Sequence, residues 1–175
     1  MAQRPAAPPV QPPGAALQSN AEEIREARKF AEQNPKNRQA WVTLGNILFD
    51  SDQPAEAIQA YTKALELGPN DADVLTDRGV MYRRIGDFAS AVADFRKAAD
   101  LSPKHIPSVY NLGLVLLHDL QDARGAKEAW ERLMTRNPPP ELAADMNQRL
   151  FQLQQILDNP SLMPPKTGGL PPQMR

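Results

Sequence analysis

The chain contains 175 residues, which is enough for one domain with a hydrophobic core or for a short repeat array with tails. Its 20 basic and 21 acidic side chains give a net charge of −1, which excludes the strongly basic surface that binding to nucleic acid or to an anionic membrane requires. The sequence has no cysteine, which excludes disulfides, thiolate metal sites and cysteine nucleophiles.

The two ends of the chain differ in composition from its middle, because ten of the 18 prolines fall within residues 1–19 or after residue 158. Segments of this kind bury too little apolar surface to offset the entropy lost on ordering. We therefore expect a disordered Pro/Ala-rich linker over residues 1–18 and a disordered Pro-rich tail over residues 158–175. No apolar run is long enough to span a bilayer, and the N-terminus lacks the apolar segment of a signal peptide.

Helical order is expected to begin at Ser19. The spacing of Ser19 and Glu22 is that of a capping box, which satisfies two amides at a helix N-terminus. Apolar residues within 24–31 share one helical face, and Pro35 follows the last turn. The sequence predicts an N-terminal helix over residues 19–34.

The next hundred residues repeat with a period of 34. The first halves of the units align as Trp41, Leu75 and Val109; Leu44, Arg78 and Leu112; Gly45, Gly79 and Gly113; and Leu48, Tyr82 and Leu116. The second halves align as Ala57 with Ala91, Tyr61 with Phe95, Ala64 with Ala98, and Pro69 with Pro103.

The third unit contains one extra residue, because Trp130 lies 35 residues after Phe95. The insertion falls between Gly113 and Trp130. Since turns accept insertions at low cost, we expect the extra residue in the turn near residues 121–125.

This period and residue set resemble the tetratricopeptide-repeat (TPR) family, whose pattern is W-x2-L-G-x2-Y, then A-x3-F, then P. The first unit matches from Trp41 to Leu48, at Ala57-x3-Tyr61 and at Pro69, and the resemblance covers residues 38–138. The second unit departs from the pattern at Leu75 and Arg78, and the third departs at Val109 and Leu116.

The resemblance implies an all-α fold, a right-handed superhelix of three helix–turn–helix repeats. We place the repeats at about residues 38–71, 72–105 and 106–140, each with a helix A and an antiparallel helix B. Gly45, Gly79 and Gly113 are expected where helix A crosses helix B.

A C-terminal capping helix is predicted over residues 140–157. Its apolar residues step by three or four positions along one face and its other face is polar, as the exposed end of an open solenoid requires. The apolar residues are Leu142, Met146, Leu150, Leu153 and Leu157.

The sequence does not indicate catalysis. His105 and His118 are 13 residues apart and lack metal-ligand spacing, and the sequence contains no nucleophile elbow, phosphate loop or zinc-protease motif. Carboxylates are scattered over polar helix faces. We therefore expect a protein without enzymatic activity, metal or cofactor.

The expected binding surface is the concave face, which the A helices line in TPR arrays. Helical periodicity places these groove residues on it: Val42, Asn46, Phe49, Thr76, Asp77, Val80, Arg83, Arg84, Tyr110, Asn111, Leu114, Leu117 and His118, together with Gln39, Asp50, Asp73 and Pro107. The apolar members among them would form an exposed strip with a basic corner at Arg83 and Arg84. Such a strip usually marks a binding site, and the alternative is coverage by a neighbouring segment or tail of the same chain.

One TPR subclass grips the C-terminal carboxylate of a chaperone peptide through Lys, Asn and Arg side chains. Carried over by position, that set falls on Val42, Asn46, Asp77, Pro107 and Asn111, and of these Asn46 alone matches. Asp77 would repel the carboxylate. We therefore expect a protein or peptide partner with an apolar or amphipathic segment and not a carboxylate-clamp C-terminus.

The leading functional hypothesis is an interaction scaffold or adaptor that aids assembly of a bacterial complex. The chain resembles small bacterial TPR proteins with a Pro-rich tether, which would place it in the cytoplasm or periplasm, tethered to the envelope if an anchor has been removed. Two alternatives stay open: a self-assembling structural protein and an accessory subunit of an enzyme. The Pro-rich ends are expected to be spacers, with polyproline-type ligands as the alternative.

Overall fold

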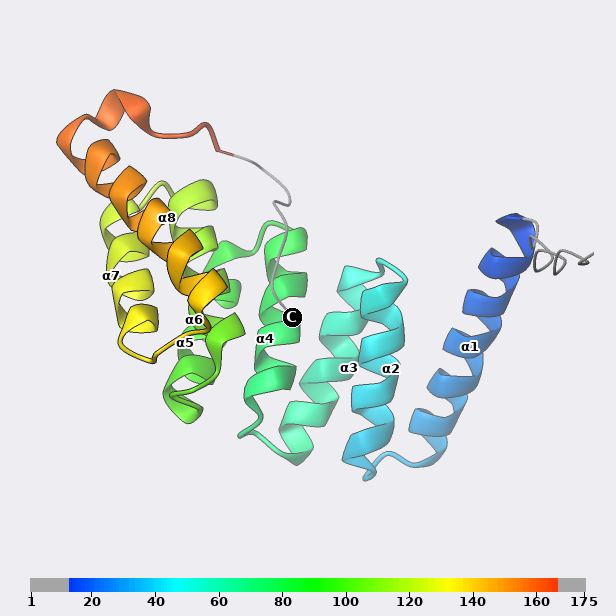
Figure 1. Ribbon diagram of the computed structural model, residues 1–175. Helices are drawn as coiled ribbons and strands as arrows, with labels where there is room; N and C mark the ends of the chain where they lie inside the picture. The colour runs from blue at the N-terminus through cyan, green and yellow to red at the C-terminus, as the bar shows by residue number, and fades with distance from the viewer. Residues whose placement is uncertain (1–12, 167–175) are drawn as a thin grey trace, which may run out of the picture.

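The computed structural model describes residues 13–166 and gives side chains from residue 20 onward. Its elements are α1 (Pro13–Gln33), α2 (Arg38–Asp50), α3 (Pro54–Leu67), α4 (Ala72–Arg84), α5 (Phe88–Leu101), α6 (Ile106–Leu114), the π-helical η1 (Val115–Asp119), α7 (Ala123–Met134), α8 (Pro140–Asp158) and the 3₁₀ turn η2 (Pro160–Leu162). Figure 1 shows the helices side by side in chain order, from α1 at one end of the array to α8 at the other.

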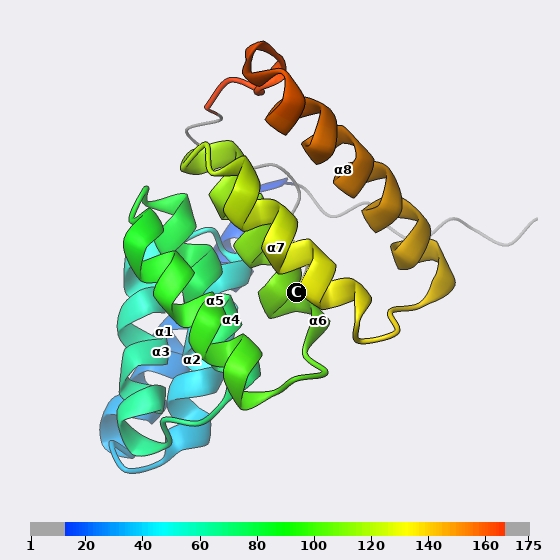
Figure 2. The ribbon, with the colours of Figure 1, turned by 90° about the vertical axis from the view of Figure 1, so that its left-hand side faces the viewer.

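Antiparallel pairs of neighbouring helices build the array: α2 with α3, α4 with α5, and α6 with α7. We call α2, α4 and α6 the A helices and α3, α5 and α7 the B helices. Figure 2 shows α8 lying outside α7 at the end of the array. These pairs confirm the predicted all-α TPR superhelix.

The three repeated glycines lie where each A helix crosses its B helix, as predicted. A β-carbon on Gly79 would lie 2.7 Å from Phe95 Cε1, and one on Gly45 would lie 2.5 Å from Tyr61 Cε1. Phe95 and Tyr61 are fully buried at these crossings. Each repeat therefore needs a glycine to let an aromatic ring of the B helix pack against the backbone of the A helix.

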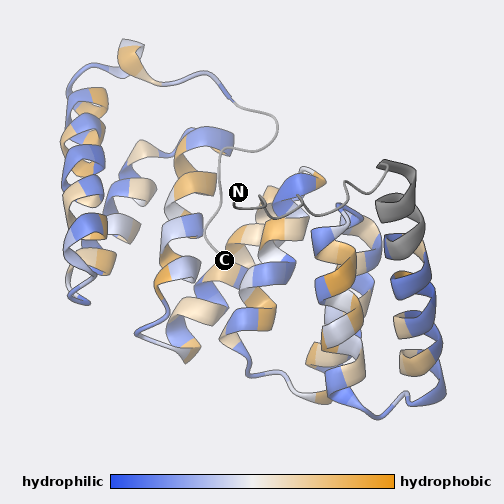
Figure 3. Ribbon diagram, turned by 45° about the vertical axis from the view of Figure 1, so that its right-hand side comes forward, coloured by the Kyte–Doolittle hydropathy of each residue, from blue (hydrophilic) through white to orange (hydrophobic). Residues whose placement is uncertain are grey.

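One continuous core runs through the array. On α8, Met146 and Leu153 are buried, and the other members of the predicted apolar stripe are partly buried against the core. Figure 3 shows hydrophilic residues along the outward sides of α1 and α8, the two ends of the array. The capping helix thus has the one-sided pattern that the sequence predicts.

The extra residue of the third unit lies inside its A helix, which corrects the expectation of a longer turn. All three A-to-B turns contain three residues, and each places its middle residue at positive φ: Asp52 at 54°, Gly86 at 81° and Gln121 at 60°. The insertion instead forms η1, where the Leu120 amide donates to Val115 O, five residues back, at 3.0 Å. A single inserted residue is what a π-bulge absorbs in a helix.

The predicted boundaries at both ends are too narrow. Helix α1 begins at Pro13 and includes Ser19 in its interior, because a proline fits the first helical turn and the following alanines and leucine favour helix. After α8, η2 and residues 163–166 return toward the third repeat, where Gln121 Nε2 donates to Pro164 O at 2.6 Å. The rest of the expected linker and tail, residues 1–12 and 167–175, lies outside the described residues.

Candidate functional site

The expected groove residues divide into three groups by burial. Eight are buried: Thr76, Asp77, Val80, Arg83, Tyr110, Asn111, Leu114 and Leu117. Val42, Asn46, Phe49, Arg84, His118 and Pro107 are partly exposed, and Gln39, Asp50 and Asp73 are exposed. The exposed apolar strip is therefore absent from α4 and α6, whose apolar members belong to the core.

The reason is that each inner A helix is flanked on both sides. Helix α4 packs against α3 and α5 and also touches α2 and α6. Val80 and Leu114, which share one repeat position, are consequently 1% and 2% exposed. A prediction from helical periodicity considers one helix at a time. It therefore placed on the surface a face of α4 and α6 that neighbouring helices cover.

The expected basic corner is also neutralised. Arg83 Nε donates to Asp119 Oδ2, and both side chains are 1% exposed. Arg84 pairs with Asp52, and its guanidinium carbon lies 5.5 Å from the centre of the Phe49 ring. Two adjacent arginines thus connect α4 to the third repeat on one side and to the first repeat on the other.

A polar hollow of about 280 Å³ lies between α2, α4 and the start of α6. We call it the acidic pocket, and its lining residues are Asn46, Asp73, Thr76, Asp77 and His105. Four of them, all except His105, are expected groove residues, so the structure does bring this part of the predicted site together. Asp73, with a side chain that is 85% exposed, supplies an accessible carboxylate.

The acidic pocket is held in place by hydrogen bonds. Tyr61 Oη donates to Asn46 Oδ1 at 2.9 Å, and His105 Nε2 lies 2.9 Å from Asp73 Oδ1. Thr76 Oγ1 donates to Ala72 O at 2.7 Å. Asn46, Asp73, Thr76 and His105 therefore have defined positions before any partner arrives.

His105 was not among the expected groove residues, although the repeat period could have found it. It is the N-cap residue of α6, and the N-caps of α2 and α4 are Asn37 and Asp71. These three positions are 34 residues apart. An N-cap on an A helix lies at the rim of the face that the A helices form, and this period places His105 there.

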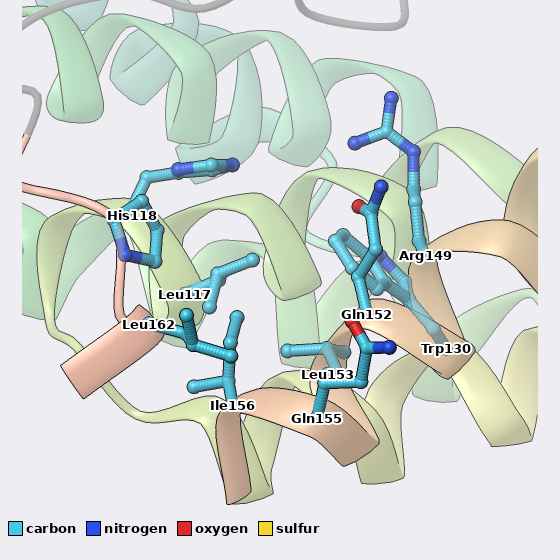
Figure 4. A pocket seen from close by; sticks show the side chains of 10 residues that line it. Leu117, His118, Trp130, Arg149, Gln152, Leu153, Gln155, Ile156 and Leu162 are labelled. Atoms are coloured by element: carbon cyan, nitrogen blue, oxygen red, sulfur yellow. The ribbon is translucent and has the colours of Figure 1, made fainter. Parts of the chain in front are cut away.

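A second hollow, of about 340 Å³, lies where η1, α7, α8 and the C-terminal segment meet. We call it the terminal pocket. Its lining residues are Leu117, His118, Trp130, Arg149, Gln152, Leu153, Gln155, Ile156, Leu162 and Pro164. Figure 4 shows the polar ends of His118, Gln152 and Arg149 on one side of this pocket and Leu117, Ile156 and Leu162 on the other.

The pKa of His118 lies below its ordinary value of 6.5. Burial is the main cause, and the nearby guanidinium of Arg83 lowers the pKa further, while Asp119 opposes the shift. The imidazole is therefore neutral at pH 7. Its Nδ1 is buried and has no hydrogen-bond partner among the described residues.

A third hollow, of about 520 Å³, lies between α1, α2 and α3. Its rim carries charges of both signs, including the ion pair of Arg28 with Glu56, and its apolar wall includes Trp41. The mixed charges of this rim do not select a ligand of one sign.

Within residues 20–166, no three His, Asp or Glu side chains are grouped so that they could hold a metal ion. No described helix combines the length and apolar character needed to cross a bilayer.

Antiparallel helix pairs that stack in chain order, as they do here, are characteristic of helical-repeat solenoids. The chain belongs to the tetratricopeptide-repeat family, because the model of that repeat matches residues 19–72 and 42–106, which together make up half of the chain. The first match includes α1, which lies one period before α3 and so occupies the position of a B helix.

Curated relatives share parts of their length with this chain. Human protein O-mannosyl-transferase TMTC3 is 27% identical over 124 residues, which cover 68% of this chain and 13% of TMTC3. The E3 ubiquitin-protein ligase CHIP of Arabidopsis thaliana is 34% identical over 84 residues, or 48% of this chain and 30% of CHIP. The chain thus spans only a small part of these proteins.

Solved structures support the same fold. The crystal structure of MamA superposes with a TM-score of 0.65 at 18% identity, covering 87% of this chain and 98% of MamA. The first TPR of Spaghetti (RPAP3), bound to the HSP90 peptide SRMEEVD, superposes with a TM-score of 0.61 at 25% identity, covering 70% of this chain and 94% of that one.

Proposed function

We propose that this protein is an interaction adaptor, without chemistry of its own, that holds an amphipathic segment of a partner protein on the face formed by its A helices. The observation that carries the proposal is the acidic pocket, a preformed hollow on that face with the exposed carboxylate of Asp73 at its edge. The partly exposed Val42 and Phe49 on α2 offer apolar contacts on the same helix as Asn46.

The charge of the pocket selects the partner chemistry. Asp73 and Asp77 favour a lysine or arginine side chain and disfavour a C-terminal carboxylate. The RPAP3 domain was solved with a peptide that ends in an acidic residue, SRMEEVD. Asp77 stands at a position where the carboxylate-clamp subclass uses asparagine, so we propose that the two grooves differ in the sign of their ligand.

The test is affinity capture from the source organism, comparing the wild type with Asp73→Lys. Asp100→Lys is the matched control, because Asp100 is a similarly exposed, ion-paired aspartate on the B helix α5. We expect one or more partners to be lost with Asp73→Lys and kept with Asp100→Lys. Capture that is identical for all three proteins would exclude the acidic pocket as the partner site.

A direct measurement uses the peptide SRMEEVD with a fluorescent label. We expect this chain not to bind it, whereas the RPAP3 domain serves as the positive control. Saturable binding that disappears when the peptide C-terminus is amidated would show a carboxylate clamp and contradict the proposed partner chemistry.

Self-association is a second candidate, and the two ends of the array favour it. Among the described residues, no A helix precedes α1, which occupies a B position, and no B helix follows α8. Phe30 on α1 is 53% exposed and Phe151 on α8 is 66% exposed. Sedimentation at rising concentration tests this, and a mass increase abolished by Phe151→Ser would support it.

A further inference from the structure

The terminal pocket lies at the inserted residue that distinguishes the third repeat from the other two. Its inserted residue lies in η1, and η1 supplies Leu117 and His118 to the pocket wall. Because one extra residue rotates the following side chains by about 100° around a helix, the insertion changes which residues face α8. π-bulges occur frequently at functional sites, and the adaptor role proposed above makes no use of this one.

The cations around the terminal pocket are held in fixed positions. Arg149 Nε donates to Asp145 Oδ2 at 2.8 Å, and the guanidinium carbon lies 5.7 Å from the Tyr110 ring centre and 5.6 Å from that of Trp130. A guanidinium stacked on two rings loses little freedom when it binds a further acceptor.

Two guanidinium nitrogens beside this pocket lack a hydrogen-bond acceptor within the described part of the chain. Arg83 uses Nε for Asp119, and its Nη1 and Nη2 are buried without a hydrogen-bond partner among the described residues. Arg83 is close enough to His118 to lower the pKa of the imidazole. The nearby acids, Asp119 and Asp145, are already bonded to arginines, so the charges around this pocket favour a ligand with an acceptor group over a further cation.

The remaining walls are apolar. Leu117, Trp130, Leu153 and Ile156 form the inner part, and Leu162 and Pro164 of the C-terminal segment close one side. The volume of about 340 Å³ lies near the lower end of the range of about 300–1,000 Å³ that small-ligand pockets occupy. A ligand of this site therefore combines a compact apolar body with a hydrogen-bond-accepting head.

We infer that the terminal pocket binds a small free carboxylate with an apolar chain, with the carboxylate at Arg149 and His118 and the chain against Trp130 and Ile156. The contact between Gln121 Nε2 and Pro164 O, at 2.6 Å, holds the C-terminal segment over the pocket. Occupancy would therefore stabilise the last helix and this segment together. The inference is independent of the acidic pocket, which lies on other residues.

The test is fluorescence titration of the full chain with octanoate in a Trp41→Phe background. The protein has two tryptophans, so the remaining signal comes from Trp130 in the pocket wall. We expect saturable binding at one site per chain. Arg149→Gln should weaken it by about ten-fold to a hundred-fold, the loss that removal of a charged hydrogen-bond donor produces.

Arg84→Gln is the matched control, because Arg84 also stacks on a ring and pairs with an aspartate but lies two repeats from α8. Its affinity for octanoate should equal that of the wild type. Gln152→Phe fills the pocket without removing a charge and should also block binding, so the proposal does not depend on a single variant.

Three results would overturn the proposal. The first is a signal that octanoate does not saturate at millimolar concentration. The second is binding of octanamide as tight as that of octanoate, which would show an apolar pocket without carboxylate selection. A peptide with a C-terminal leucine could bind through its free carboxylate while octanoate does not, which would make the site a peptide-docking surface instead.

Discussion

The two junctions of the central repeat are built differently. At the first junction, Arg84 of α4 reaches Asp52 of the first repeat in a pair whose carboxylate is 73% exposed. At the second junction, Arg83 reaches Asp119 in a pair that is 1% exposed on both sides. Two adjacent residues of α4 thus form one solvated and one desolvated ion pair. The difference in burial determines how much the loss of each pair changes the free energy of unfolding.

The two pockets also lie on either side of the central repeat. Between the first and second repeats lies the acidic pocket, with exposed Asp73 at its edge. Beyond the second junction, η1 and α8 line the terminal pocket. The two ligand preferences that we propose differ in charge, and the inserted residue and the capping helix, which line the terminal pocket, belong to the third repeat and its end.

The largest effect is expected from Asp119→Asn, which leaves Arg83 charged and buried without its counter-ion. We expect a loss of about 3–5 kcal/mol in the free energy of unfolding, measured by urea denaturation. The matched change Asp52→Asn removes the counter-ion of Arg84 and should cost only about 0–1 kcal/mol. Equal losses at the two junctions would contradict the distinction between them.

Gly79→Leu tests the helix crossing inside the central repeat. The added side chain would collide with Phe95, and overpacking of this kind costs on the order of 1–3 kcal/mol or more. Thermal unfolding followed by circular dichroism measures the change. An unaltered melting midpoint would mean that this glycine does not set the distance between α4 and α5.

Asp71→Ala tests the first junction at its rim. Burial alone would raise the pKa of Asp71, but hydrogen bonds from the Val74 amide and from Arg38 outweigh burial and lower the pKa below its ordinary value of 3.8. As the N-cap of α4, it should contribute about 0.5–2 kcal/mol. This contribution is present above pH 4 and is lost as the pH falls through the lowered pKa. Asp100→Ala, on the exposed side of α5, should change stability less.

The smallest effect is the pH dependence from His118 beside the second junction. Its folded-state pKa is lowered, so the unfolded chain takes up a proton first as the pH falls below about 6.5. Stability should therefore decline on acidification in that range, and His118→Gln should remove this part of the slope. A slope that is identical in the variant would place the titrating group elsewhere.

Two buried residues are unsuitable as surface probes, although periodicity placed them in the groove. Tyr110 is 9% exposed and Leu114 is 2% exposed, so the double variant Tyr110→Ala/Leu114→Ala would leave cavities in the core and destabilise the fold. Loss of partner binding in that variant would report unfolding. Asp73, on the same face, can be changed without disturbing the packing.

The sequence by itself determined the fold and much of its internal order. Three features of the sequence reflect local packing requirements: the 34-residue period, the three glycines and the apolar stripe of residues 142–157. Requirements of this kind can be predicted from residue spacing alone. The period also places Asn46 and Asp77 on the A helices, where the structure finds them lining one pocket.

Which helix faces remain exposed depends on the packing of whole repeats. Val80 and Leu114 are buried because neighbouring helices cover them, and the covering helices lie in other repeats. An extra residue in the turn and an extra residue in the A helix give the same alignment of the residues that follow, so the sequence does not distinguish them. In the structure the extra residue lies in η1. The terminal pocket combines residues from 117 to 164, and no local pattern indicates that they meet. Contacts between distant segments depend on the stacking of whole repeats, which spacing within one repeat does not encode.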